Sequence, residues 1–139
     1  MPDSSTIDQA IAAKLLGDST LQGLLPDGVW FDEAKQGATR FVVVSLIIEA
    51  DEPAFGGRAF EDALYLVKAV VLASTGVNIA QAAARIDALL EDQPLTASGY
   101  TWMTVFREER IRTTEVDEFN RDLRWLHRGG RYRVQMSVT

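Results

Sequence analysis

The sequence predicts an α+β protein in which two helices pack on one face of a mainly antiparallel β-sheet. Long stretches of alternating or continuously apolar residues, typical of strands, flank a segment with a clear helical stripe. The predicted order is helix, strands, helix, strands, without the regular strand–helix alternation of a parallel sheet. No repeat, linker or low-complexity tract divides the 139 residues, so a single domain spanning residues 1–139 is expected.

The N-terminal part of the chain predicts a helix, a short helical turn and a short extended piece. Thr6 and Gln9 have the spacing of a capping box, and apolar residues continue at helical spacing until Gly17 ends the helix. Residues 19–25 then carry three leucines in a second helical turn, and residues 29–31 are extended.

Two long strands follow. Residues 41–50 are apolar on both sides, which predicts a central strand covered on both faces. Four of its apolar residues should share one face: Val42, Val44, Leu46 and Ile48. Residues 59–74 alternate and are rich in β-branched side chains. Between them, residues 51–59 predict a long, mobile hairpin loop, because Pro53 and the Gly56-Gly57 pair disfavour regular pairing.

The second half of the chain predicts a helix and two further strands. Asn78 is suited to cap a helix that ends before Pro94. Alternating residues 100–114 predict a strand, and the acidic residues 115–122 a loop. Residues 123–138 predict a last strand or hairpin, split or bulged at the glycine pair Gly129-Gly130.

Composition excludes several kinds of chemistry. The chain has no cysteine, which excludes disulfides, thiolate zinc sites and iron–sulfur clusters. His127 is the only histidine, so multi-histidine metal sites are excluded as well. The sequence holds no phosphate-binding glycine motif and no nucleophile elbow. We therefore expect no enzyme activity, no catalytic residue, no cofactor and no metal.

The charge is distributed unevenly. The net charge is −6, but residues 1–100 carry −8 and residues 101–139 carry +2. This is either ordinary scatter or an acidic and a basic surface that meet on neighbouring copies. Six acids are threaded among the eight C-terminal arginines, and arginine without lysine is favoured at protein interfaces. We therefore favour a protein interface over direct nucleic-acid recognition.

No targeting segment is visible, and the longest apolar run, residues 41–50, is far shorter than the ~20 residues that span a bilayer. We expect a protein made in a cytoplasm, without a membrane partner.

The segment order resembles the tail completion or tail terminator family of long-tailed bacteriophages. The likeness covers about residues 7–138 and rests on architecture rather than on a signature motif. It is carried by "LLGDSTLQGLL", "VWF", "FVVVSLII", a glycine-rich loop, "FEDALYLVKAVVLAST", "NIAQAAARIDALLED" and "LRWLHRGGRYRVQMSV".

The resemblance implies a structural virion protein, made in a host bacterial cytoplasm, from a free phage or a prophage. It would form a hexameric ring that caps the tail tube and ends its polymerisation. Its partners would be the major tail tube protein and the head–tail connector or neck protein. The candidate interface residues combine the predicted loop, as an arm, with the arginine-rich strands: Phe55, Arg58, Arg107, Arg110, Arg124, Arg128, Arg131 and Arg133.

Three alternatives stay open. The chain could be a different head–tail connector or neck adaptor. It could bind a small molecule in a sheet–helix cleft near Trp102 and Trp125, or it could be an acid–base enzyme built on His127.

Overall fold

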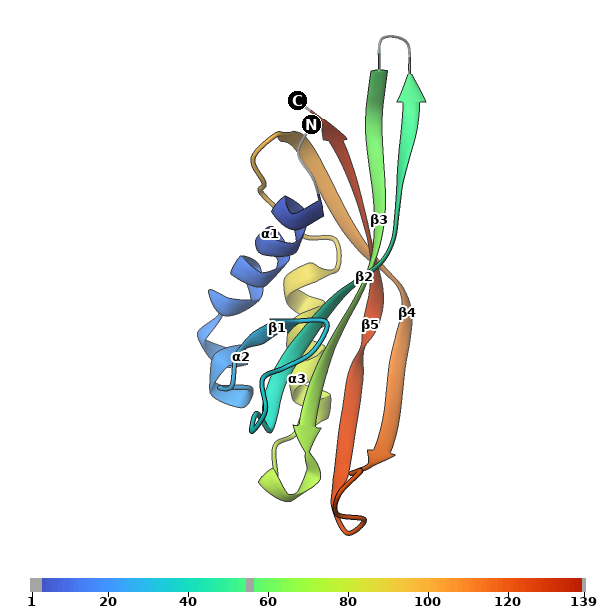
Figure 1. The fold of residues 1–139 in the computed structure, drawn as a ribbon. Helices are drawn as coiled ribbons and strands as arrows, with labels where there is room; N and C mark the ends of the chain where they lie inside the picture. Colours follow the sequence, from blue (N-terminus) through green and yellow to red (C-terminus); the bar gives the residue numbers. More distant parts are fainter. Residues whose placement is uncertain (1–3, 55–56, 139) are drawn as a thin grey trace.

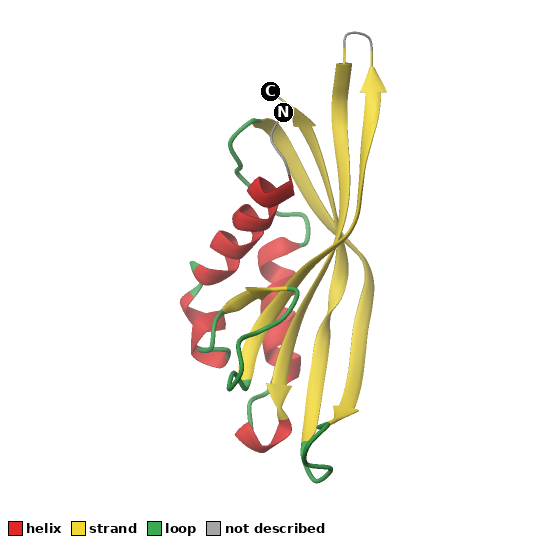
Figure 2. Cartoon of the chain, in the orientation of Figure 1, coloured by secondary structure: helices red, strands yellow, loops and turns green. Residues whose placement is uncertain are grey.

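The computed structural model describes residues 4–54 and 57–138, which form a five-stranded sheet with helices on one face (Figures 1 and 2). The helices are α1 (Ser4–Leu16), α2 (Ser19–Leu24) and α3 (Ile79–Leu90), and a 3-10 turn covers Ala73–Thr75. The strands are β1 (Val29–Phe31), β2 (Arg40–Ala54), β3 (Gly57–Leu72), β4 (Tyr100–Val116) and β5 (Arg124–Val138). The predicted α+β class is confirmed, with a third helix because residues 19–24 complete a short helix capped by Asp18.

The strand order is β1-β2-β3-β5-β4. Only the β1–β2 pair is parallel, and the other three pairs are antiparallel. The four long strands twist strongly, so that they cross near the middle of the sheet in Figure 2. The β2–β3 hairpin extends beyond the helices at one end (Figure 1). None of the helices in residues 4–54 and 57–138 is long and apolar enough to cross a membrane.

The main core lies between the helices and one face of the sheet. Its largest fully buried side chains come from all three helices, from the residue after α2 and from strands β2, β3 and β5: Ile7, Ile11, Leu15, Leu21, Leu25, Ile86, Leu90, Val42, Tyr65, Tyr132 and Met136. Each fully buried apolar side chain of this size stabilises the fold by about 1.5–3 kcal/mol. The opposite face, here called the outer face, carries a smaller cluster of Ala38, Phe41, Val43 and Val70.

The predicted break of the last strand at Gly129-Gly130 is wrong, because β5 runs without a register shift along β3. A Cβ atom at Gly129 would lie only 2.2 Å from the carbonyl oxygen of Val67 and 2.5 Å from the Cα of Lys68. The glycine is therefore needed for the close approach of β5 to β3.

The predicted loop over residues 51–59 is also wrong for the part that the structure describes. β2 continues to Ala54 and β3 begins at Gly57, and Pro53 pairs with Arg58 after a register shift. Proline has no backbone N–H to donate to the ladder, and a shift in register, as between Glu52 and Pro53, is a place where it can be accommodated within a strand pair. Phe55 lies outside the described residues.

The predicted β2 strand is covered on both faces only as far as Val44. Leu46, Ile47 and Ile48 are 36%, 39% and 59% exposed. A bulge between Leu46 and Ile48 also moves Ile48 to the outer face, away from the face predicted for it. The capping box at Thr6 is wrong too, since α1 already begins at Ser4.

Candidate assembly interface

A β-bulge on β4 sorts the charges of residues 107–112, REERIR, onto two faces of the sheet. Arg107 pairs with Tyr132 and Glu109 with Arg131, so β4 holds one extra residue between them. Side chains otherwise alternate along a strand, and this extra residue shifts the alternation by one. Arg110 and Arg112 therefore lie on the same face as Arg107, the face that carries the helices.

A groove of about 360 Å³ opens on this face between α3 and the β4–β5 ladder. We call it the arginine groove. It is lined by Ala80, Ala83, Ala84 and Asp87 of α3, by Arg107, Arg110, Ile111 and Arg112 of β4, and by Arg128, Gly129 and Tyr132 of β5. The alanine side chains of α3 are small, which leaves an open space between α3 and the longer arginine side chains of β4 and β5.

One carboxylate, that of Asp87, is among the side chains that line the arginine groove. Asp87 Oδ1 accepts a hydrogen bond of 2.9 Å from the hydroxyl of Tyr132 and lies 2.6 Å from Nη1 of Arg107. Burial, together with the Asp87 hydrogen bond, raises the pKa of Tyr132, and the hydrogen bond with Asp87 raises the pKa of Arg107. Arg107 is thus neutralised within the molecule.

The other three arginines of the groove are different. Arg110, Arg112 and Arg128 form no ion pair and no side-chain hydrogen bond within the described residues. Arg110 and Arg112 are exposed, while Arg128 is half-buried. Each guanidinium presents up to five donors in a planar fork that fits a carboxylate. The groove therefore offers three unpaired cations beside an apolar wall.

On the outer face the arginines of β5 are paired. Arg131 Nε lies 2.7 Å from Glu109 Oε1, and Arg133 Nη1 lies 2.6 Å from Asp62 Oδ1. Arg133 also binds both carboxylate oxygens of Glu108. The Arg133 guanidinium holds the pKa of the Glu108 carboxyl below its usual range, and the two carboxylates raise the pKa of Arg133 itself. These charges are already compensated.

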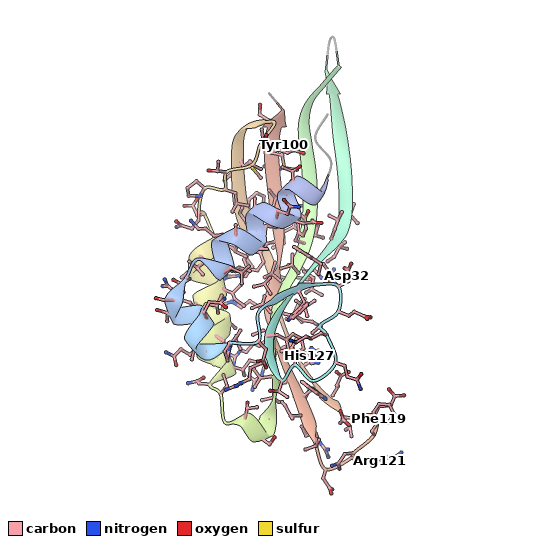
Figure 3. All side chains as sticks on the ribbon, turned by 60° about the vertical axis from the view of Figure 1, so that its left-hand side comes forward. Asp32, Tyr100, Phe119, Arg121 and His127 are labelled. Carbon is pink, nitrogen blue, oxygen red and sulfur yellow. The ribbon has the colours of Figure 1, made fainter. Side chains whose placement is uncertain are left out.

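The loop between β4 and β5 carries exposed groups. Asp117 accepts hydrogen bonds from Trp125 Nε1 and from the backbone of Asn120 and Phe119, which shape the loop and lower the pKa of Asp117. Phe119 is 93% exposed, and Figure 3 shows it with Arg121 at the end of the sheet, directed away from the body. We call residues 117–122 the acidic loop.

The single histidine lies on the outer face, in a hollow of about 410 Å³. His127 Nε2 is 3.0 Å from Glu115 Oε1, and its Nδ1 is buried without a hydrogen-bond partner. Asp32 and Lys68 line the same hollow, whose position can be followed from the labelled His127 and Asp32 in Figure 3. Within the described ranges, no three histidine, aspartate or glutamate side chains gather as a set that could hold a metal ion.

The predicted cleft shared by Trp102 and Trp125 is not formed. Trp102 pairs with Ser137 near one end of the β4–β5 ladder, whereas Trp125 pairs with Glu115 near the other end. Trp125 packs on Phe41 with their ring centroids 6.3 Å apart, and this contact belongs to the outer face, which the helices do not cover. Two residues near opposite ends of one ladder cannot line one small cavity.

The predicted interface residues are thus divided among several places. The arginine groove contains Arg107, Arg110 and Arg128, while the outer face contains Arg131 and Arg133. Two more predicted residues lie elsewhere: Arg58 at the start of β3, and the exposed Arg124, which donates to the backbone carbonyl of Leu123 beside the acidic loop.

Arg112 was missed as an interface candidate. The sequence signal for it would have been the arginines at positions 107, 110 and 112. Three side chains with this spacing lie on one face of a strand only if a bulge intervenes.

A second open surface is the edge of β2. Within the described residues, β1 pairs with Val42–Val44 only, and no strand pairs with the outer edge of β2 beyond them. The exposed Leu46, Ile47 and Ile48 lie on this stretch. An open edge with apolar side chains can pair with a strand of another chain.

No protein-family model and no curated protein matches the sequence. Among solved structures, the chain is similar to one from the virion of a native gene transfer agent particle, with 20% identity and a TM-score of 0.64 over 96% of both chains. A second solved chain, which carries no functional description, is 17% identical with a TM-score of 0.61, over 100% of this chain and 99% of the other. At these identities the likeness establishes a shared fold.

Proposed function

We propose that this protein is a structural component of a phage-like virion that works by assembling with copies of itself and with other virion proteins. The observation that carries the proposal is the shared fold with a chain of a gene transfer agent virion, which extends over 96% of both chains. The segment order that resembles tail completion proteins supports the same role independently.

Within the virion, we propose the role of a tail terminator. The protein would form a hexameric ring at the end of the tail tube, stop tube polymerisation and meet the head–tail connector. Its partners would be the major tail tube protein and the neck protein, and it would perform no catalysis. A different neck adaptor of the same fold would also form a ring but would not bind the tube.

Two surface features support self-assembly. The open edge of β2, with its exposed Ile48, and the arginine groove involve different parts of the molecule. A ring needs heterologous contacts, in which one surface of each copy meets a different surface of the next. A chain with several distinct uncovered surfaces can satisfy this requirement.

The experiment is native mass spectrometry of the purified chain, alone and with the major tail tube protein. A tail terminator should form a closed oligomer, with six copies expected, and should bind tube ends in electron micrographs. A closed oligomer that does not bind the tail tube favours the role of a neck adaptor. A strict monomer at all concentrations, even with the tube protein present, contradicts assembly altogether.

The same experiment tests whether His127 takes part in assembly. His127→Ala should leave the oligomer intact, because Glu115 is the one side-chain partner of His127 among the described residues and His127 lies outside the arginine groove. Loss of assembly in this variant while it remains folded would mean that the outer-face hollow takes part in subunit contacts.

A further inference from the structure

We propose that the arginine groove of one copy binds the acidic loop of a second copy. Carboxylates of the loop would pair with the three unpaired arginines, and Phe119 would pack on the apolar wall of α3. This inference rests on the proposed self-assembly and names the surfaces that carry it.

The charges of the two surfaces are complementary. Glu118 and Asp122 on the acidic loop form no side-chain ion pair within the described residues, just as Arg112 and Arg128 form none in the groove. Arginine binds a carboxylate through two parallel hydrogen bonds, and such charge-assisted pairs are stronger than neutral ones. Each surface therefore holds what the other lacks.

The apolar parts fit as well. Phe119 is 93% exposed, so its ring is left uncovered by the residues that the structure describes. The groove offers the methyl groups of Ala80, Ala83 and Ala84 on α3. A buried aromatic anchor surrounded by charged pairs is the usual composition of an interface centre.

The acidic loop is already ordered by hydrogen bonds within its own copy. Asp117 fixes the backbone of Phe119 and Asn120, and the backbone amide of Asp117 donates to the carbonyl of Leu123 at 3.1 Å. A preordered loop loses less conformational entropy on binding than a flexible one, which favours association.

A second copy is the occupant that this arrangement favours. Phe119 and Arg121 of the loop point away from the body of their own copy (Figure 3), and the groove lies farther along the ladder beside α3. Groove and loop are different surfaces of the same chain, so a head-to-tail pairing leaves one groove and one loop free for further copies, and such a contact closes into a ring when its rotation allows. The test below measures both assembly and DNA binding, so it distinguishes a second copy from nucleic acid as the partner of the groove.

The test is reversal of charge on each side and then on both. Arg112→Glu and Glu118→Arg should each weaken assembly by about tenfold or more, measured as the concentration for half-assembly by light scattering. The double variant Arg112→Glu with Glu118→Arg should recover most of this loss, because the pair is restored with its charges exchanged. Phe119→Ser should also weaken assembly, without rescue by either charge change.

Matched controls place the same charge changes elsewhere. Lys35→Glu and Glu33→Arg alter exposed residues outside both surfaces and should leave assembly within about twofold of the unchanged protein. Circular dichroism and thermal unfolding of every variant exclude loss of fold as the cause.

The outcomes separate the inference from the proposed function. If the unchanged protein assembles and the reversals have no effect, or the double variant is no better than its singles, the inference is overturned while self-assembly stands. If the unchanged protein never assembles, both fail. If Arg112→Glu abolishes binding of double-stranded DNA but leaves assembly intact, the groove is a nucleic-acid site and the inference is overturned.

Discussion

The two faces of the β4–β5 ladder carry the same kind of side chain in different electrostatic states. On the outer face, Arg131 and Arg133 are each bound to at least one carboxylate of their own molecule. On the helix side, Arg110, Arg112 and Arg128 have no such partner within the described residues. One inserted residue on β4 brings Arg110 and Arg112 to the same face as Arg107, while the regular alternation of β5 separates Arg128 from Arg131 and Arg133. Arginine content along a sequence therefore does not reveal which arginines are available for a partner.

The difference also separates two roles. Paired arginines on an exposed face contribute modestly to the free energy of unfolding, about 0–1 kcal/mol for each pair. Unpaired arginines contribute little to the fold but keep their full capacity to bind a carboxylate. The outer face is thus expected to respond in stability measurements and the groove in assembly measurements. Four substitutions or conditions test this division.

The largest effect is expected at Gly129, where the backbone of β5 approaches the backbone of β3 and so supports both faces of the sheet. Gly129→Ala would place a Cβ atom 2.2 Å from a backbone oxygen of β3, which neither strand can relieve without moving. We expect the free energy of unfolding to fall by about 3 kcal/mol or more in chemical denaturation. Gly23→Ala is the control, since nothing lies within 4 Å of its added Cβ in α2. A loss below about 1 kcal/mol at Gly129 would show that the strands can separate cheaply.

The next effect concerns the one carboxylate of the groove. Asp87→Ala should cost about 1–3 kcal/mol of unfolding free energy, because it leaves the buried hydroxyl of Tyr132 without its acceptor. Tyr132→Phe should cost less, since it removes that hydroxyl rather than stranding it. The Asp87 variant also leaves Arg107 unpaired, like Arg110. Equal costs for the two variants would contradict the assigned role of Asp87.

A smaller effect compares one arginine from each face. Arg133→Ala should lower the free energy of unfolding by about 1 kcal/mol, because it breaks contacts with Asp62 and Glu108. Arg112→Ala should change it by no more than about 0.5 kcal/mol. High salt should shrink the first difference by screening. Equal effects at both positions, measured by urea denaturation below the assembly concentration, would remove the distinction between the faces.

The smallest effect is a pH dependence confined to the outer face. Arg133 lowers the pKa of Glu108 below its unfolded value of 4.5, so this pair stabilises the fold above that value and the stabilisation is lost as the pH falls through the lowered pKa. The stability difference between Arg133→Ala and the unchanged protein should therefore shrink between about pH 7 and about pH 3. The Arg112→Ala difference should stay flat. A constant Arg133 difference would place its stabilising effect outside this ion pair.

Local patterns predicted most of the elements. The side chain of Asn78 caps α3 by accepting from the amide of Gln81 at 3.1 Å, as the sequence predicts. The extended piece at residues 29–31 is β1, although its parallel pairing with β2 was not predicted. Turn residues misled the prediction at Pro53 and Gly129, because a residue that usually breaks a strand can also sit in a bulge or at a close strand approach.

The candidate interface was predicted in composition and only partly in membership. The arginine-rich C-terminal segment was identified, but the face on which Arg110 and Arg112 lie depends on the bulge in the register of β4 against β5. The acidic loop was predicted as a loop, whereas the exposure of Phe119 is a property of the folded surface. A loop residue carries no local signal of whether a neighbouring element covers it.

The α+β class, the lengths of most elements and the absence of thiol chemistry follow from hydrophobic periodicity and residue types alone. Which arginines are paired and which remain free depends on contacts between strands that lie far apart in the sequence. The physical reason is the two-residue period of a strand: one inserted residue reverses every side chain beyond it, and only long-range pairing sets where that residue sits.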